Sequence, residues 1–492
     1  MQQCLLAQSV SYKEPYRPQF HFSPKAHWMN DPNGMVYVKG VYHLFYQYYP
    51  DSTVWGPMHW GHATSTNLVN WKHEPVALFP DSLGYIFSGS VVVDELNTSK
   101  LQGKSIHPPL VAIYTYHHME KEKAGKIDYQ YQAIAYSVDL GKTWTKYHAN
   151  PVLPNPGTKD FRDPKVMWYA AEKKWVMTLA VGDHVEFYTS PNLIDWQKSG
   201  SFGQTEGSHG GVWECPDLFP IKNSTTGKTQ WVLLVSIGTG APGGGSGTQY
   251  FVGRFNGKTF VNDNEAAQRL WLDRGCDNYA GVTWSNAPNG RRIFLGWMSN
   301  WQYAQVVPTS PWRSAMTLPR DMKLVATSAG NRLQLNPVPT VAKLHQGVPV
   351  TIETKKAYPI TTNYLDVQFS LSGSTANEFG VLVKNKKGEQ LVVGFNRLKN
   401  SYFIDRTLAG GTKAFHPAFA GIQEFPRMTT SDSIRMRIYL DRSSVELFAE
   451  DGLINMTDLF YPDEPFNQLA IYQKGGAVKL ISGTLQGLKS IW

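Results

Sequence analysis

The amino-acid sequence predicts an all-β protein: a five-bladed β-propeller followed by a C-terminal β-sandwich. Short runs rich in β-branched and aromatic residues recur along the chain between Gly, Asn, Asp and Pro, and no stretch shows a sustained helical period with caps. A pattern of Ser, Asn or Asp, Leu and a nearby Trp occurs as STNLVNW at 65–71, SVDLGKTW at 137–144 and SPNLIDW at 190–196. Repeats at this separation, each spanning several strands, are typical of propeller blades.

Five segments begin with small or polar residues and continue into a strand, and we interpret each as the inner strand of one blade. They start at MNDPNG (29–34), FSGS (87–90), FRDPK (161–165), ECPD (214–217) and DNYAG (277–281). Because the inner strands of a propeller surround one axis, residues that are far apart in sequence come together there. The residues predicted to face this axis are Asp31, Ser88, Asp163, Glu214 and Tyr279.

The chain is long for a single core, and its character changes at the Pro-punctuated stretch NPVPT (336–340). Beyond it, Ile434, Met436, Ile438 and Leu440 alternate with polar neighbours, as in a half-buried strand. We therefore predict a propeller over 20–335, a linker over 336–344, and a β-sandwich over 345–492 that packs on the propeller.

The first residues, MQQCLLAQSV, are similar to the clipped end of a secretion signal, although the charged and apolar lead is missing. We treat 1–19 as an N-terminal lead and predict a secreted, periplasmic or cell-surface protein. No apolar run approaches the length that crosses a bilayer, so no membrane span is expected.

Composition argues against several classes of function. Lys and Arg exceed Asp and Glu by 47 − 39 = 8, but they are scattered, so nucleic-acid binding is not expected. Cys4, Cys215 and Cys276 leave one cysteine over from any pair and show no Cys-x-x-Cys spacing, so a disulfide framework is not expected. Aromatic residues make up 13% of the chain, and many stand beside polar residues, where a flat ring can stack on a sugar or a base.

Two local patterns are set aside. GTGAPG (238–243) fits a dinucleotide-binding pattern, but its proline and the glycines that follow prevent a helix, so we expect a loop that borders the site and no cofactor. His59 and His62, and the pair His117 and His118, lie in strand-like segments where their spacing does not bring side chains together. We expect packing or surface roles for these histidines and no metal.

Three carboxylates stand at the mouths of proposed inner strands: Asp31, Asp163 and Glu214. Taken alone, Asp31 is typical of a turn, and Asp163 also precedes a proline that favours extended backbone. Their equivalent positions in the repeat are harder to explain by turn chemistry. Two carboxylates on either side of a glycosidic bond are the working groups of glycoside hydrolysis, one as nucleophile or base and the other as acid. The sequence thus favours a catalytic cluster, with turn formation as the alternative.

The motifs WMNDPNG, FSGS, FRDPK and WECPDLF, in this order, resemble the signatures of glycoside hydrolase family 32, the β-fructofuranosidases that include invertases, inulinases and levanases. The resemblance covers nearly the whole chain, including GWMSNWQYA and SPWRSAMTLPR in the fifth blade and DRSSVELFAEDG in the sandwich. It implies a propeller, a sandwich and a retaining mechanism, with Asp31 as nucleophile, Glu214 as acid and then base, and Asp163 holding fructose hydroxyls. Residues implied to line the pocket for the terminal fructose are Trp28, Asn30, Gln47, Trp55, Phe87, Ser88, Arg162, Tyr279 and Trp297.

Within that family, WMSNWQYA and YQAIAYSVDLGKTW look more like the levanase and inulinase branch than like sucrose-specialised invertases. We therefore expect an enzyme that releases fructose from the ends of levan or inulin, and sucrose as a further substrate. An endo-acting levanase and a fructosyltransferase would use the same acids, and a non-catalytic fructan-binding propeller is the alternative from another class. The sequence predicts no oligomeric state.

Overall fold

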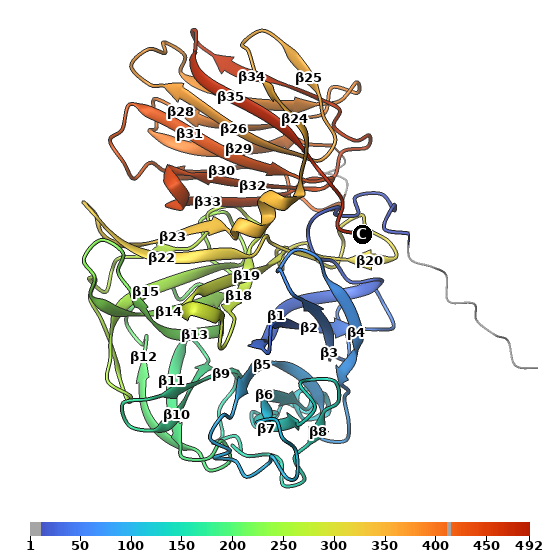
Figure 1. Cartoon of the computed structure of the whole chain (residues 1–492), viewed down its shortest axis with the longest axis vertical. Coiled ribbons are helices and arrows are strands. Elements are labelled where there is room, and N and C mark those ends of the chain that lie inside the picture. The colour runs from blue at the N-terminus through green and yellow to red at the C-terminus, as the bar shows by residue number, and fades with distance from the viewer. Residues whose placement is uncertain (1–10, 411–414) are drawn as a thin grey trace, which may run out of the picture.

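The computed structural model describes residues 11–410 and 415–492, and these residues form five sheets around one axis and two further sheets stacked beside them (Figure 1). The opening residues 1–10, on which the secretion prediction rests, lie outside the described part of the chain. Strands dominate because the β-branched and aromatic runs are bounded by turn residues, as expected from the sequence. The predicted five-bladed propeller and C-terminal sandwich are therefore confirmed.

Each of the five sheets is one blade whose strands follow in chain order from the axis outward, with short strands added at some edges. The first blade holds β1 (His27–Val38), β2 (Val41–Tyr49), β3 (His59–Ser65) and β4 (Lys72–Leu78). The second holds β5 (Tyr85–Val93), β6 (Leu110–His117), β7 (Gln130–Ser137) and β8 (Thr145–Lys146). The third holds β9 (Phe161–Tyr169), β10 (Lys174–Val181), β11 (His184–Ser190) and β12 (Gln197–Phe202).

The last two blades carry the additional short strands. The fourth holds β13 (Trp213–Lys222), β14 (Thr229–Ile237), β15 (Gly247–Phe255), β16 (Phe260–Asn262) and β17 (Leu270–Trp271). The fifth holds β18 (Tyr279–Thr283), β19 (Arg292–Met298), β21 (Ala315–Met316), β22 (Arg320–Thr327) and β23 (Gly330–Pro337). The remaining strand, β20 (Trp312–Arg313), leaves the fifth blade and pairs in parallel with the start of β1. This pairing ties the last blade to the first.

The inner strands contact one another in a closed ring: β1 with β5, β5 with β9, β9 with β13, β13 with β18, and β18 with β1. These are the five strands predicted from the repeated openings. Apolar side chains fill the spaces between neighbouring blades, as in the cluster of Phe45, Trp60, Tyr114 and Tyr116 between the first two. The packed blades hold the ring rigid, and the ends of five distant segments are thereby fixed around one axis.

The sandwich consists of two six-stranded sheets. One holds β24 (His345–Thr351), β26 (Asn363–Ser370), β31 (Ser433–Leu440), β32 (Ser444–Ala449), β33 (Ile454–Leu459) and β35 (Lys479–Leu488). The other holds β25 (Ala357–Pro359), β27 (Glu378–Lys384), β28 (Gln390–Asn396), β29 (Ser401–Leu408), β30 (Ile422–Pro426) and β34 (Gln468–Lys474). The alternation predicted around Ile434 is seen in β31, whose apolar residues enter the core between the sheets.

Helix is confined to four short elements in the described part of the chain: α1 (Met119–Lys123), η1 (Pro288–Gly290), η2 (Pro339–Leu344) and η3 (Glu450–Gly452). The 3₁₀ helix η2 connects the last propeller strand to the first strand of the sandwich. Among the described residues, no helix has the length and apolar character needed to cross a membrane.

The propeller and the sandwich meet at a buried group of charged side chains, which we call the interface cluster: His21, Asp273, Arg320, Asp441 and Glu446. His21 lies between two carboxylates, with Nδ1 2.8 Å from Asp441 and Nε2 2.7 Å from Glu446. Arg320 donates from one Nη to Asp273 at 3.0 Å and from the other to Glu446. Every charge in this cluster has an opposite charge in contact, which is what makes its burial tolerable.

Candidate active site

All five inner strands are irregular at the position that was predicted to face the axis. The pairing register shifts between Met29 and Pro32 in β1, between Ile86 and Gly89 in β5, and between Glu214 and Asp217 in β13. Equivalent shifts occur around Asp163 in β9 and between Tyr279 and Val282 in β18. A bulge re-aims a side chain out of the regular pleat. The repeated irregularity therefore turns one polar side chain of each blade toward the common axis.

Asp31 lies inside strand β1, within the bulge, and not in a hairpin turn. Its Oδ1 accepts a hydrogen bond from Asn30 Nδ2 at 3.0 Å, and its Oδ2 accepts one from Ser88 Oγ at 2.8 Å. Burial and the nearby charge of Glu214 raise the pKa of Asp31. The two donors fix the orientation of the carboxylate, and one of them comes from the neighbouring blade.

Asp163 has the left-handed backbone conformation, with φ at 62°, and its side chain is 5% exposed. Its backbone N–H donates to Thr115 Oγ1 at 3.0 Å, and its Oδ2 accepts the backbone N–H of Cys215 at 3.0 Å. A non-glycine residue held at positive φ is strained, and such strain is retained where the surrounding structure over-determines it. Burial, together with the charges of Glu214 and Asp31, raises the pKa of Asp163 against the opposing effect of Arg162.

The Glu214 side chain is 23% exposed and is therefore more accessible than that of Asp163, which is 5% exposed. Arg162 donates to Glu214 Oε1 from Nη2 at 2.9 Å and from Nε at 3.2 Å. Tyr279 donates its hydroxyl hydrogen bond to Glu214 Oε2. The carboxylate is thus held on both oxygens while one side remains open to the cavity described next.

Cys215 lies between the two aspartates and connects them. Its Sγ is 3.5 Å from Asp31 Oδ2 and 3.7 Å from Asp163 Oδ2. Burial and the surrounding carboxylates raise the pKa of the Cys215 thiol, so it stays protonated and acts as a weak donor. Asp31, Asp163 and Glu214 therefore belong to one continuous group of contacts, as the sequence predicted.

These side chains open onto a cavity of about 230 Å³. Nine of the residues singled out in the sequence line it: Asn30, Asp31, Gln47, Trp55, Phe87, Ser88, Arg162, Asp163 and Glu214. They come from the first four blades, and Trp301, after β19, supplies a half-buried ring from the fifth. The cavity thus combines carboxylates with flat aromatic surfaces, a combination suited to a sugar ring.

Three residues that were expected to line the pocket lie behind its surface instead. Trp28, Tyr279 and Trp297 are each at most 1% exposed. Trp28 Nε1 donates to Asn30 Oδ1 at 2.7 Å, and Trp297 Nε1 donates to the carbonyl of Met29 at 3.1 Å. Both tryptophans therefore position the backbone and side chain next to Asp31, while Tyr279 holds Glu214.

Five cavity residues were not singled out from the sequence as part of the site: His117, Glu122, Gln130, Asp160 and Trp301. His117 stacks on Phe87 with ring centroids 4.3 Å apart, and its Nε2 is 3.0 Å from Glu122. A packing or surface role was expected for His117, whereas the structure places it in the lining of the cavity. Trp301 lies within the quoted GWMSNWQYA motif, which was the one signal that could have found it.

Charge in the cavity is strongly unbalanced. Its lining contains the single guanidinium of Arg162 and five carboxylates, those of Asp31, Glu122, Asp160, Asp163 and Glu214. Although burial opposes it, contact with Glu214, Asp163 and Asp160 raises the pKa of Arg162 further above its usual range. An excess of carboxylates that share one cavity supports proton transfer and nucleophilic attack more readily than a balanced ion pair does.

The segment 238–246, which contains the discounted glycine pattern, connects β14 to β15 as a loop. A Cβ placed on Gly238 would lie 3.9 Å from Glu214 Oε2, so the loop borders the site as expected. Within 11–410 and 415–492, no group of three or more His, Cys, Asp or Glu side chains has the arrangement needed to hold a metal ion.

Comparison with known proteins identifies the family. Residues 21–337 match the model of the glycosyl hydrolases family 32 N-terminal domain, and 338–487 match the model of the family 32 C-terminal domain. A levanase of Bacillus subtilis is 49% identical over 99% of this chain and 72% of its own length. An extracellular exo-inulinase of Aspergillus niger is 37% identical over 99% of this chain and 97% of its own.

A solved structure agrees with these sequence matches. The crystal structure of exo-inulinase from Aspergillus awamori superposes with a TM-score of 0.90 at 35% identity, covering 98% of this chain and all of the other. The chain spans about half, 53%, of a second levanase, from a Bacillus species, at 36% identity. With both domains matched in order over nearly its whole length, the chain belongs to glycoside hydrolase family 32 and is a glycosidase of the levanase and inulinase branch.

Proposed function

We propose that this protein is a retaining glycoside hydrolase that releases fructose from the non-reducing ends of β-fructans, levan and inulin, and also cleaves sucrose. The observation that carries the proposal is the convergence of Asp31, Asp163 and Glu214 on one small cavity, each oriented by named donors. The relatives named levanase and exo-inulinase support the substrate class.

In the first step, Asp31 attacks the anomeric carbon of the terminal fructosyl unit and Glu214 gives a proton to the departing oxygen. Asp31 is suited to attack because Asn30 and Ser88 fix its carboxylate without covering it with a cation. Glu214 is suited to proton donation because its side chain is partly exposed and reaches the cavity from a different blade than Asp31. The retaining pathway requires these two carboxyl groups to be roughly 5 Å apart.

In the second step, Glu214 takes a proton from water, and the water oxygen attacks the anomeric carbon and releases Asp31. Asp163 accepts hydrogen bonds from fructose hydroxyls in this proposal, which favours the positively charged transition state. Arg162 keeps Glu214 in position through both steps, since its two nitrogens contact the same carboxylate oxygen.

Cavity size supports action at chain ends. The volume of about 230 Å³ is below the roughly 300–1,000 Å³ typical of pockets for drug-sized ligands. Such a space suits one terminal unit better than the middle of a chain. The sandwich braces the propeller through the interface cluster and does not reach this cavity with any of its lining residues. Secretion is supported by the extracellular relatives.

The proposal is tested by following products from levan, inulin and sucrose at early conversion by chromatography. Fructose as the sole early product from both polymers is the expected result. A ladder of short oligosaccharides would establish an endo-acting enzyme, and longer products from sucrose would establish a fructosyltransferase. Binding of fructan with no product at all would leave only the non-catalytic alternative.

A further inference from the structure

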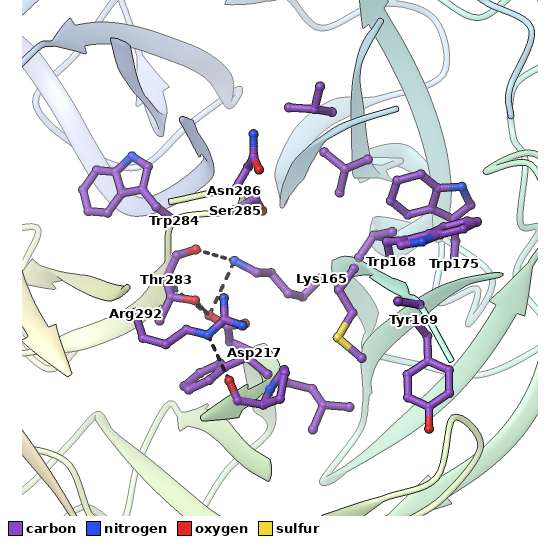
Figure 2. A pocket seen from close by; sticks show the side chains of 18 of the residues that line it. Lys165, Trp168, Tyr169, Trp175, Asp217, Thr283, Trp284, Ser285, Asn286 and Arg292 are labelled. Atoms are coloured by element: carbon purple, nitrogen blue, oxygen red, sulfur yellow. Dashed lines mark hydrogen bonds and ion pairs between the residues drawn. The ribbon is translucent and has the colours of Figure 1, made fainter. Parts of the chain in front are cut away.

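A second and larger cavity, of about 770 Å³, lies on the propeller and shares no lining residue with the first (Figure 2). The same inner strands line both cavities with different parts of their length. In β9, Asp163 faces the first cavity and Lys165 the second; in β13, Glu214 faces the first and Asp217 the second. Because each inner strand runs along the axis, the two cavities lie at opposite ends of the ring.

One wall of the second cavity is aromatic. Trp168 and Tyr169 at the end of β9, Trp175 in β10 and Trp231 in β14 all line it. Trp168 and Trp175 pack edge to face with ring centroids 5.0 Å apart, and Figure 2 shows them with Tyr169 on the side opposite the charged residues. Leu96, on the rim, is 67% exposed and adds an apolar side chain to the edge of the cavity.

The opposite side carries charged groups with unused hydrogen-bonding capacity. Asp217 Oδ2 accepts from Thr283 N at 2.6 Å and from Thr283 Oγ1 at 2.8 Å, and Lys165 Nζ lies 3.4 Å from it. Asp217 Oδ1 is buried and has no partner among the described residues. Lys165 donates to the carbonyl of Thr283, and Arg292 donates from Nε to the carbonyl of Pro220, which leaves donors on both cations for a ligand.

We propose that this cavity is a second, non-catalytic carbohydrate site, which holds a short stretch of fructan. A sugar presents adjacent hydroxyls that accept hydrogen bonds, so it can pair with the free donors of Lys165 and Arg292 together. Its C–H faces pack on Trp168 and Tyr169. A purely apolar ligand would leave the free donors of Lys165 and Arg292 without partners, and an anion would be placed beside the Asp217 carboxylate.

The choice of fructan as the sugar rests on the proposed function. The cavity is more than three times the volume of the first, 770 against 230 Å³, so it has room for several units where the first holds a chain end. A polymer held at one end of the propeller raises the local concentration of chain ends at the other. The site would therefore matter for long fructan and not for sucrose.

The test is a calorimetric titration of the Asp31→Asn variant with a short inulin oligosaccharide, which this variant cannot consume. Two binding sites per chain are expected. Adding Trp168→Ala or Leu96→Asp should weaken one of them by about tenfold, while Trp168→Phe should retain it. Leu96→Asp cannot fail through loss of core packing, because the side chain is already largely exposed. The matched control is Trp196→Ala, a half-buried tryptophan outside both cavities, which should change neither site.

A single binding site, or two sites that are unaffected by both Trp168→Ala and Leu96→Asp, would overturn the proposal. In the otherwise wild-type enzyme, the same two changes should lower the rate on long inulin relative to the rate on sucrose. Failure of the proposed function is recognised separately, as absence of fructose release by the unchanged enzyme from levan, inulin and sucrose. An enzyme that hydrolyses inulin but shows one binding site would refute the second site alone.

Discussion

Asp31 in the candidate active site and Glu446 in the interface cluster are both carboxylates whose surroundings change their pKa, but the two pKa values shift in opposite directions. At the open end of the axis, burial and the charge of Glu214 raise the pKa of Asp31. In the interface cluster, burial alone would raise the pKa of Glu446, but Arg320 and His21 lower it. Burial is common to both sites, so burial does not distinguish them. What distinguishes the candidate active site is an excess of negative charge that opens onto a cavity.

The same contrast has a consequence for stability. A carboxylate whose pKa is raised by folding costs stability whenever it is ionised, whereas one whose pKa is lowered contributes stability. The axis group should therefore reduce the stability of the propeller at neutral pH, and the interface cluster should increase it. Replacing one acid in each site by its amide tests this difference, because the amide keeps the shape and removes the charge.

The largest effect is expected from Asp31→Asn. Loss of the nucleophile should lower kcat on sucrose on the order of 10⁴-fold or more, as is typical when a nucleophile is removed. Folding raises the pKa of Asp31, so the ionised carboxylate costs stability at neutral pH. Because the amide removes this charge, the variant should also unfold at a temperature about 1–3 °C higher at neutral pH. Activity assays and thermal unfolding check the two parts, and normal turnover would remove Asp31 from the catalytic role.

Glu446→Gln should destabilise the fold and leave the rate nearly unchanged, the opposite of Asp31→Asn. The change leaves Arg320 and His21 without their shared carboxylate in a fully buried place, and the expected loss is about 3–5 kcal/mol in the free energy of unfolding. The rate per folded molecule should stay near that of the unchanged enzyme, since Glu446 does not line the cavity. Denaturant unfolding measures the loss, and a stability equal to that of Asp31→Asn would show that the two sites do not differ.

The interface cluster also predicts a pH dependence of stability. Although burial opposes it, hydrogen bonds to Asp441 and Glu446 raise the pKa of His21 to about 9. A histidine with a raised pKa contributes stability that is fully present below its unfolded pKa of about 6.5 and is lost as pH rises through about 9. The unfolding temperature should therefore fall across this window.

Asp458 is also buried, and burial raises its pKa to about 8. Stability therefore falls as pH rises toward about 8 for this group too, in the same direction as for His21. The contribution of His21 is isolated by comparing the unchanged protein with His21→Gln. The variant should be less stable at about pH 6, and the difference between the two proteins should shrink toward about pH 9.5. A stability difference that stays constant between about pH 6 and pH 9.5 would mean that His21 is not the protonated group that stabilises the cluster.

The inner strands and the three acids could be predicted from the sequence because their signals are local. Asp31, Asp163 and Glu214 lie in short motifs, each at the start of a repeat. Because repeats of several strands are typical of propeller blades, the starts of the repeats are expected to lie around one axis. The bulge that turns Asp31 out of β1 could not be predicted, since it depends on how β1 pairs with β2. For this reason the Asn-Asp-Pro-Asn-Gly segment suggested a turn where the structure has a strand.

The rest of the cavity depends on contacts that no local pattern reports. His117 and Gln130 enter it from the second and third strands of a blade, and their sequence neighbourhoods are those of ordinary buried strands. Trp28 and Trp297 belong to the family motifs but are fully buried behind the residues that line the cavity. A motif does not show which of its residues reach the cavity surface. Depth from the surface is decided by packing between blades, which the sequence does not give.

The smallest effect is expected from replacing the buried Cys215, which contacts Asp31, with Cys276 as the comparison. Cys215 Sγ lies against Asp31 Oδ2 at 3.5 Å, whereas Cys276 Sγ lies 2.8 Å from the carbonyl of Gly243 and does not line the cavity of the candidate active site. A hydroxyl is a stronger donor than a thiol, so Cys215→Ser should stabilise the ionised form of Asp31 and lower its pKa. The acid limb of the pH profile of kcat/KM on sucrose should then move to lower pH by a fraction of a unit, with a few-fold loss of rate because a better-solvated carboxylate is a weaker nucleophile. Cys276→Ser is the matched control and should leave the profile in place. An equal shift in both variants would show that the thiol beside Asp31 has no special part in setting its charge.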